Sequence, residues 1–334
     1  ARAGFVGVIA NPASGKDIRR VVSQATVVNN HEKVSIVQRL LLALHAGGAQ
    51  RVEIMPDHFG IGERALSGLR NHPDVVAAAS LIDMPIEHSA DDSLRAAQYL
   101  RDVGAGCIVV LGGDGTCRVV AKGCGDVPLL PVSTGTNNVL PSFVEGTIAG
   151  SAAAYVARHP EVDREQLCQR HKRLLIIING QLRDQALVEV TLVSTAFVGA
   201  RAVWETGALR QIFVSRAQPV NIGLSAIIGV VQPVEPTQPA GATARILPDG
   251  RKVRVPIAPG HIVSVGIGEI IEMEPGAAHG VLGERPAVLA LDGEREIPLR
   301  VDDQAEVTLD LKGPWLVDVE RTQLAAVADG EFVI

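Results

Sequence analysis

The residues best suited to phosphate chemistry form a glycine-rich run with one acid, Gly-Gly-Asp-Gly-Thr at positions 112–116. The run directly follows an apolar segment, residues 107–111, which predicts a buried parallel strand. Glycine lets the backbone come close to a ligand, so successive N–H groups can face phosphate oxygens. Asp114 adds one carboxylate, which suits either a magnesium ion or the proton of a hydroxyl group.

The same run also fits a structural interpretation, in which Asp114 only caps a helix that begins near Thr116. Two more polar loops favour a ligand site. Residues 11–16 read Asn-Pro-Ala-Ser-Gly-Lys after the apolar segment 5–10, and residues 133–138 read Ser-Thr-Gly-Thr-Asn-Asn after another apolar segment. In an open α/β sheet, loops at the carboxyl ends of the strands converge on one crevice. Three such loops therefore predict a single nucleotide site.

Two familiar nucleotide-binding motifs are missing from the sequence. A Walker P-loop needs a glycine further upstream and Ser or Thr after its Gly-Lys pair, but Asp17 follows Lys16. The pattern Gly-x-Gly-x-x-Gly is also absent, because Gly104 and Gly106 precede their strand and lack the third glycine. A hydride-transferring enzyme is therefore disfavoured.

The three loops resemble those of the kinases of NAD, diacylglycerol and sphingosine, which share a Gly-Gly-Asp-Gly loop and an Asn-Pro-x-Ser-Gly opening. Together with Ala-Leu-Val-Glu-Val at 186–190 they are most similar to the acetoin-catabolism protein X family of NAD-kinase-like proteins. This resemblance implies an NAD-kinase-like fold and a link to acetoin catabolism. It also implies transfer of the γ-phosphoryl group of ATP, with Mg²⁺, to a hydroxyl group of NAD, an NAD-like compound or a small metabolite.

The resemblance, together with the chemistry of the loops, assigns the site residues. Asp114 is the catalytic candidate, as the base for the acceptor hydroxyl or as a magnesium ligand. The nucleotide-binding candidates are Asn11, Ser14, Gly15, Lys16, Gly112, Gly113, Gly115, Thr116, Thr134, Gly135, Thr136 and Asn137. For Lys16 the alternative is a solvated lysine at the start of a helix. The acceptor-binding candidates are Asn138, Glu189 and Glu294.

Three residues bear on the identity of the acceptor. Val188 stands where NAD kinases have an asparagine that holds a ribose, and valine cannot form that hydrogen bond, so NAD is predicted to be a poor acceptor. Glu189 matches the acid of that segment, although a solvated strand residue is an equally good interpretation. The Asp-Gly-Glu sequence at 292–294 resembles that of lipid kinases, but Asp-Gly is also a common hairpin turn, which is the interpretation we favour.

The composition predicts a folded, two-domain protein, which agrees with the nucleotide and small-molecule partners that the resemblance implies. The chain has 334 residues, of which 47% are hydrophobic, enough for two sizeable cores. A net charge of −6 without a Lys/Arg-rich run argues against nucleic acid or a membrane as partner, and 3% aromatic residues supply few stacking platforms. The oligomeric state, including a homo-oligomer, is left open.

The four cysteines lack C-x-x-C spacing and are expected to be reduced. The sequence shows neither a leader-like segment nor an apolar run of membrane length, so we expect a cytoplasmic protein. It also shows no histidine cluster at metal spacing and no nucleophile elbow, which disfavours hydrolytic chemistry.

The order of predicted elements indicates an α/β domain at 1–160 and a β-rich domain at 161–314, with 315–334 as a candidate addition to the first. In the first half, strands alternate with helices, as in a parallel sheet, and one of these strands is expected at 75–82. Ser89 begins a capping-box-like helix start. From residue 173 the pattern changes to hairpins, with turns at three pairs: Asn-Gly at 179–180, Asp-Gly at 249–250 and Asp-Gly at 292–293.

Two other functions stay open at this point. A nucleotide-binding regulator without turnover fits the departure at Val188. A lipid kinase of the diacylglycerol kinase type fits Asp-Gly-Glu at 292–294, but the sequence lacks the basic patch and amphipathic helix of a membrane-binding enzyme.

Overall fold

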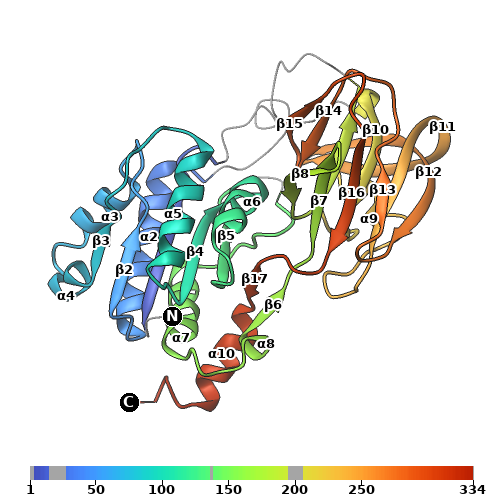
Figure 1. The fold of residues 1–334 in the computed structure, drawn as a ribbon. Helices are drawn as coiled ribbons and strands as arrows, with labels where there is room; N and C mark the ends of the chain where they lie inside the picture. Colours follow the sequence, from blue (N-terminus) through green and yellow to red (C-terminus); the bar gives the residue numbers. More distant parts are fainter. Residues whose placement is uncertain (1–3, 15–27, 136–137, 195–205, 334) are drawn as a thin grey trace.

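The computed structural model describes residues 4–14, 28–135, 138–194 and 206–333. These residues form an α/β unit around one sheet and a β-rich unit with two antiparallel sheets (Figure 1). This order, parallel α/β first and antiparallel β second, confirms the predicted fold class.

The first sheet has seven strands in the order β3-β2-β1-β4-β5-β17-β6. Neighbours from β3 to β17 run parallel, and β6 pairs antiparallel with β17. The strands are β1 (Phe5–Ala10), β2 (Arg51–Ile54), β3 (Ala79–Leu81), β4 (Cys107–Gly112), β5 (Leu129–Ser133), β6 (Cys168–Arg170) and β17 (Trp315–Val317).

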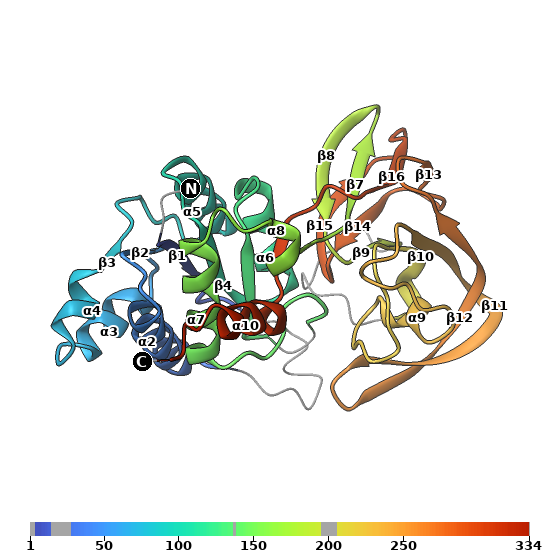
Figure 2. The same ribbon diagram turned by 90° about the horizontal axis from the view of Figure 1, so that it is seen from below.

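Helices cover both faces of this sheet. Because side chains alternate along a strand, Val6 and Val8 pack with α2 and α7, whereas Ile9 lies on the opposite face with α5 and α6. In Figure 2, α10 lies beside α7, so the last helix completes the first unit. The helices of the first unit are α2 (Asn30–Ala46), α3 (Ile61–Gly68), α4 (Pro73–Ala77), α5 (Ala90–Asp102), α6 (Asp114–Gly123), α7 (Gly146–Arg158), α8 (Arg164–Leu167) and α10 (Val319–Ala328). The short helix α9 (Ala226–Gly229) belongs to the β-rich unit.

The β-rich unit is a sandwich of a six-stranded sheet, β12-β11-β10-β9-β14-β15, and a four-stranded sheet, β13-β16-β7-β8. Ile176 and Val307 of the smaller sheet share a buried core with Leu192 and Phe213 of the larger one. The strands are β7 (Arg173–Ile178), β8 (Gln181–Ala186), β9 (Glu189–Val193), β10 (Leu209–Val214), β11 (Gly241–Ala258), β12 (His261–Met273), β13 (Ala278–Gly280), β14 (Ala287–Leu291), β15 (Glu294–Leu299) and β16 (Ala305–Asp310).

Two predicted hairpin turns are confirmed. The φ angles are 53° and 75° at residues 179–180, which join β7 to β8, and 48° and 83° at residues 292–293, which join β14 to β15. Positive φ at both central residues is the requirement of a type I′ turn, which Asn-Gly and Asp-Gly meet at low cost. The helix start at Ser89 is also confirmed as a capping box with Asp92.

Two local predictions are wrong. The Asp-Gly pair at 249–250 does not turn the chain, because β11 continues through it and both Ile246 and Arg251 pair with Ile267 of β12. A Cβ on Gly250 would lie 2.6 Å from the carbonyl oxygen of Ile267, so this glycine permits a close strand approach at a bulge. The strand expected at 75–82 is reduced to β3, because Pro73 starts the helix α4.

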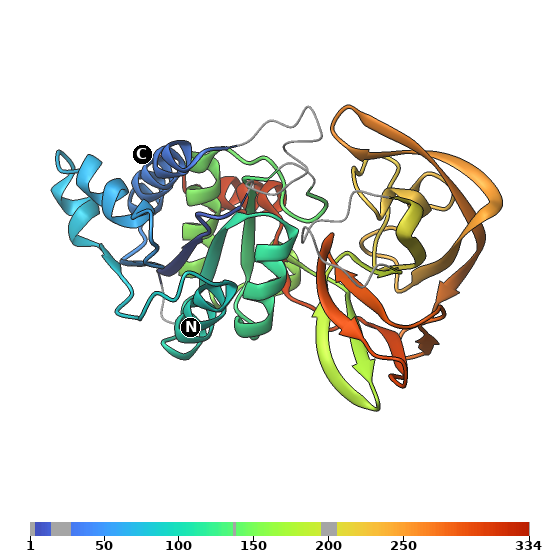
Figure 3. The same cartoon turned by 90° about the horizontal axis from the view of Figure 1, so that it is seen from above.

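The two units share part of one core. Leu187 and Val188, between β8 and β9, are fully buried in the apolar cluster that α5 and α6 form on the first sheet. Viewed from above in Figure 3, the β-rich unit lies beside the end of α6, next to the carboxyl ends of β4 and β5. The carboxyl ends of the first sheet therefore face the second unit.

Candidate active site

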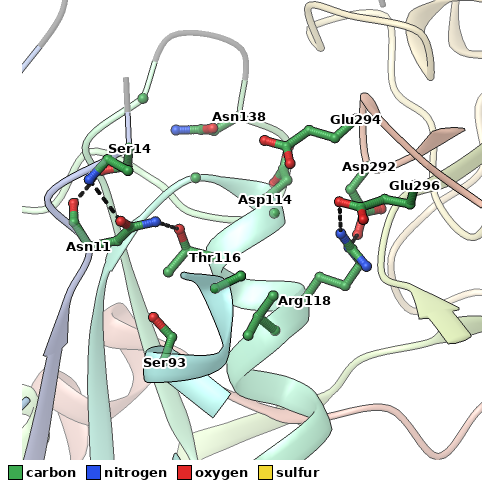
Figure 4. Close-up of a pocket in the computed structure, with 16 residues that line it drawn as sticks. Asn11, Ser14, Ser93, Asp114, Thr116, Arg118, Asn138, Asp292, Glu294 and Glu296 are labelled. Atoms are coloured by element: carbon green, nitrogen blue, oxygen red, sulfur yellow. Dashed lines mark hydrogen bonds and ion pairs between the residues drawn. The ribbon is translucent and has the colours of Figure 1, made fainter. Parts of the chain in front are cut away.

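A cleft lies where the carboxyl ends of β1, β4 and β5 meet the turn between β14 and β15 (Figure 4). It combines groups from both units. Of the predicted site residues, those that line it are Asn11, Ser14, Gly113, Asp114, Gly115, Thr116, Gly135, Asn138 and Glu294. Gly15, Lys16, Thr136 and Asn137 lie outside the described residues.

Hydrogen bonds join the three predicted loops into one structure. The amide nitrogen Nδ2 of Asn11 donates to Oγ1 of Thr116 at 2.9 Å, which ties the first loop to α6. Oγ of Ser14 lies 2.9 Å from Oγ1 of Thr134, which ties the same loop to the third. The backbone N–H of Thr134 donates to the carbonyl oxygen of Gly112 at 3.1 Å. The polar side chains of these loops are therefore held in place before any ligand binds.

A buried lysine supports the first loop from behind. Lys33 of α2 is fully buried, and its Nζ donates to the carbonyl oxygens of Asn11 at 2.9 Å and Ser14 at 3.0 Å and to Oδ1 of Asn30 at 3.1 Å. Its charge lies next to the loop expected to face phosphate. Sequence reasoning missed Lys33, because one lysine near the start of an amphipathic helix looks like a solvated residue.

Asp114 is the first residue of α6, and its carboxylate bonds to the third loop. Both of its oxygens accept the N–H of Val139, and Oδ1 accepts that of Leu140 at 2.8 Å. Burial raises the pKa of Asp114 to about 7; the negative charge of Asp292 adds to this shift, and the two amides and Arg216 oppose it. The carboxylate therefore changes its protonation state near neutral pH.

Asp292 lines the cleft, although a hairpin turn was the interpretation favoured for its Asp-Gly pair from the sequence. Its side chain is fully buried and accepts the backbone N–H groups of Leu187 at 3.0 Å, Val188 at 2.8 Å and Glu189 at 3.2 Å. Burial raises the pKa of Asp292, while the guanidinium of Arg118 and the three amides oppose that shift. The turn is thus anchored to the start of β9.

The glycines of the loops make room for two polar side chains. A Cβ on Gly115 would lie 3.4 Å from Oε1 of Glu294, so Glu294 reaches across from β15 to the N-terminal end of α6. A Cβ on Gly113 would lie 2.8 Å from Oδ1 of Asn138, and one on Gly135 would lie 3.0 Å from Nδ2 of the same side chain. Side chains at these positions would displace Asn138 or crowd Glu294.

Two family models match different parts of the chain. A family model for the ATP-NAD kinase N-terminal domain matches residues 6–160, and one for the acetoin catabolism protein X C-terminal domain matches residues 172–312. Acetoin catabolism protein X from Cupriavidus necator is 41% identical over 317 residues, which cover 92% of this chain and 88% of that protein. The chain belongs to the acetoin catabolism protein X family.

The solved structures that match this family member are more distant from it in sequence. Yeast NADH kinase complexed with NADH gives a TM-score of 0.49 at 14% identity, covering 99% of this chain and 88% of that one. A Bacillus anthracis str. Sterne protein, provisionally described as a diacylglycerol kinase, gives a TM-score of 0.46 at 12% identity, covering 95% and 98%.

In this acetoin catabolism protein X homologue, the segment at 186–190 is buried in the protein interior. Val188 is fully buried among apolar side chains, and Glu189 is buried in β9. Neither is among the described residues that line the cleft. The role of Glu189 in acceptor binding stays a prediction. Gly112 and Thr134 lie behind the lining residues, where they shape the loops.

Residues 4–14, 28–135, 138–194 and 206–333 contain no group of three or more His, Cys, Asp or Glu side chains arranged to hold a metal ion. In the same residues, no helix combines the length and apolar character needed to cross a bilayer.

Proposed function

We propose that this protein is an ATP-dependent kinase that transfers the γ-phosphoryl group to a hydroxyl group of a small metabolite. The observation that carries the proposal is the buried carboxylate of Asp114, with a pKa of about 7, at the meeting point of three hydrogen-bonded loops. A base is most effective when its pKa lies close to the working pH. Phosphoryl transfer also depends mainly on positioning and on stabilising charge, which rigid loops provide.

The first unit supplies the nucleotide site in this proposal. The backbone N–H groups of Gly113 and Gly115 face the phosphates of ATP, and Ser14 adds a hydroxyl group. Lys16, which lies outside the described residues, pairs with a phosphate. The buried charge of Lys33 makes the first loop favourable for anions.

Magnesium fits the residues that are present. Each carboxylate oxygen of Asp114 accepts one or two N–H groups and keeps acceptor capacity, and Glu294 lies across the cleft. Magnesium commonly uses one or two carboxylates together with substrate phosphates and water, so a cage of protein ligands is not required. Glu294 would hold the ion together with phosphate oxygens and water, and Asp114 would be a ligand only in place of its role as the base; the chemistry of the ion there would be to neutralise charge on the phosphates.

The acceptor enters from the side of the second unit, where Asp114 in its ionised form takes the proton of the hydroxyl group. This side presents the carboxylates of Glu294 and Glu296, with the guanidinium of Arg118 between Glu296 and the buried Asp292. Such a surface repels a second anion, and Val188 is too deeply buried to hold a ribose. We therefore favour an uncharged hydroxy compound over NAD. The link to acetoin catabolism, taken from the relative's name, agrees with an acceptor of this kind.

A lipid kinase of the diacylglycerol kinase type is the second candidate. It is favoured by the place of Glu294, which follows the Asp-Gly turn and lines the cleft. It predicts a lipid hydroxyl group as the acceptor.

The test is a transfer assay with γ-labelled ATP and Mg²⁺ against small hydroxy compounds, NAD and diacylglycerol in micelles. Label in a small hydroxy compound supports the proposal, and label in diacylglycerol supports the second candidate. ATP binding in calorimetry without any labelled product would instead favour a nucleotide-binding regulator. Asp114→Asn is the control, because label transferred equally by this variant does not come from the proposed site.

A further inference from the structure

Arg118 connects the two units at the cleft. It lies one turn after Asp114 on α6, where residues four apart share a face. Its side chain is 4% exposed, and it lies within ion-pair distance of three acids from the second unit. These are Asp184 Oδ2 at 3.4 Å, Asp292 Oδ2 at 3.6 Å and Glu296 Oε1 at 2.9 Å.

Two of these three acids, Asp292 and Glu296, line the cleft, and they stand on either side of Glu294 in the sequence. Asp292 is the first residue of the turn between β14 and β15, and Glu296 stands two residues beyond Glu294 in β15, where the pairing with β14 shifts register. Figure 4 shows the guanidinium of Arg118 facing Asp292 and Glu296, with Glu294 on the side of Asp114. The helix α6, which begins with Asp114, therefore also binds the β14–β15 hairpin through Arg118.

We propose that Arg118 is a positioning residue: by holding Asp292 and Glu296 against α6, it sets Glu294 across the cleft from Asp114. The proposal rests on the kinase function for its activity measurement. Arg118 acts through Glu294 and touches neither ATP nor the acceptor. Without it, the turn keeps its three amide bonds to Asp292 but loses the ion pairs that Arg118 makes between it and α6.

Lys122 offers a matched control on the same helix. Its Nζ lies 2.6 Å from Oδ1 of Asp184, so it also joins α6 to the second unit. Its side chain is 30% exposed, and it is not among the described residues that line the cleft. If any ion pair between the units affected turnover, Lys122→Ala would lower kcat as well. If Arg118 acts by positioning Glu294, Lys122→Ala should leave kcat unchanged.

The activity test is a double-mutant cycle with Arg118→Ala and Glu294→Gln. A displacement of about 1 Å in a site can lower turnover on the order of 100-fold, so we expect Arg118→Ala to lower kcat between 10- and 100-fold with little change in the KM for ATP. In the Glu294→Gln background the same change should have almost no further effect, because the group that Arg118 positions is already gone. Arg118→Lys should restore part of the loss. Equal losses in both backgrounds would overturn the proposal.

A second measurement does not need turnover, so it separates this proposal from the kinase function. The amides of Leu187, Val188 and Glu189 bond to Asp292, and their hydrogen exchange reports whether the turn stays anchored. Arg118→Ala should speed their exchange on the order of tenfold, and Lys122→Ala should not. Unchanged exchange in Arg118→Ala contradicts the proposal even if the protein is a kinase. Faster exchange in a protein that transfers no phosphate supports the coupling and contradicts the kinase function alone.

Discussion

Asp114 and Asp292 come from different units of the molecule, and the negative charge of Asp292 contributes to the raised pKa of Asp114. Each carboxylate is buried, and each is held by backbone N–H groups of a neighbouring loop. In its ionised form, Asp292 opposes the ionisation of Asp114 across the boundary between the two units. The protonation of the site therefore depends on how closely the two units approach.

The first prediction concerns turnover. Loss of a base or of a metal ligand typically costs on the order of 10²- to 10⁴-fold in rate, so Asp114→Asn should lower kcat by this amount. Its fold should persist, because Asn can still accept the N–H of Leu140. Asp126→Asn, an exposed position that pairs with Arg170, serves as the control. Wild-type turnover in Asp114→Asn would remove this residue from the mechanism.

The second prediction concerns pH and stability. Asp114 loses its proton near pH 3.8 when unfolded but near 7 when folded, so the folded state holds more protons between these values. Stability contributed by the protonated form is complete below pH 3.8 and is lost as the pH rises through 7. Between pH 5 and 8, wild type should lose about 2–3 kcal/mol relative to Asp114→Asn, at 1.36 kcal/mol per pKa unit. Denaturant titrations of both proteins measure this difference, and parallel curves would contradict the raised pKa.

The third prediction concerns the lysine behind the first loop. Lys33→Met keeps the apolar stem but leaves the carbonyl oxygens of Asn11 and Ser14 without this donor. We expect a loss of about 2–4 kcal/mol in the free energy of unfolding, together with weaker ATP binding. Lys122→Met, at a partly exposed position, should change neither by much. Normal ATP affinity in calorimetry would show that the loop does not need Lys33.

The fourth prediction concerns the bond between the first loop and α6. Thr116→Val removes the oxygen that accepts from Asn11 Nδ2 and keeps the shape of the side chain. One such hydrogen bond contributes roughly 0.5–1.5 kcal/mol, so ATP should bind severalfold more weakly. Thr116→Ser keeps the hydroxyl group and should bind ATP like the wild type. Equal affinity of all three proteins would exclude the bond from nucleotide binding.

The fifth prediction concerns NAD. Val188→Asn buries an amide among apolar side chains, and we expect it to destabilise the protein by about 2–4 kcal/mol without creating NAD kinase activity. Val188→Ala loses apolar contacts alone and should be less harmful. An increase in NADP formation by Val188→Asn would instead place this residue at a ribose.

The predictable parts of the fold are those with local signals. Type I′ turns at 179–180 and 292–293 follow from residue pairs that tolerate positive φ, and Ser89 signals its helix start. Residues 249–250 are Asp-Gly, as residues 292–293 are, but they lie within β11, because β12 pairs with the chain on both sides of them. Whether a partner strand continues past a turn signal is a property of the tertiary structure.

The predictable part of the site is likewise the three loops, since glycine and small polar residues after apolar strands form a recognisable pattern. Lys33, Arg118 and Asp292 were missed because their partners lie far away in the sequence. Lys33 bonds to a carbonyl 22 residues away, and Arg118 pairs with an acid 178 residues away. No local pattern distinguishes such residues from solvated charges. Of these three residues, only Asp292 had a local signal of a functional role, because it begins the Asp-Gly-Glu sequence that resembles that of lipid kinases.

The place of β17 has a consequence for synthesis on the ribosome. This strand, formed by Trp315–Val317, lies between β5 and β6 in the first sheet, and α10 then packs on α7. A nascent chain that has emerged only as far as α7 has all three site loops but cannot complete the sheet around them. The unit that is made first is therefore finished last, and a product truncated before residue 315 should expose the unpaired edges of β5 and β6 to aggregation and proteolysis.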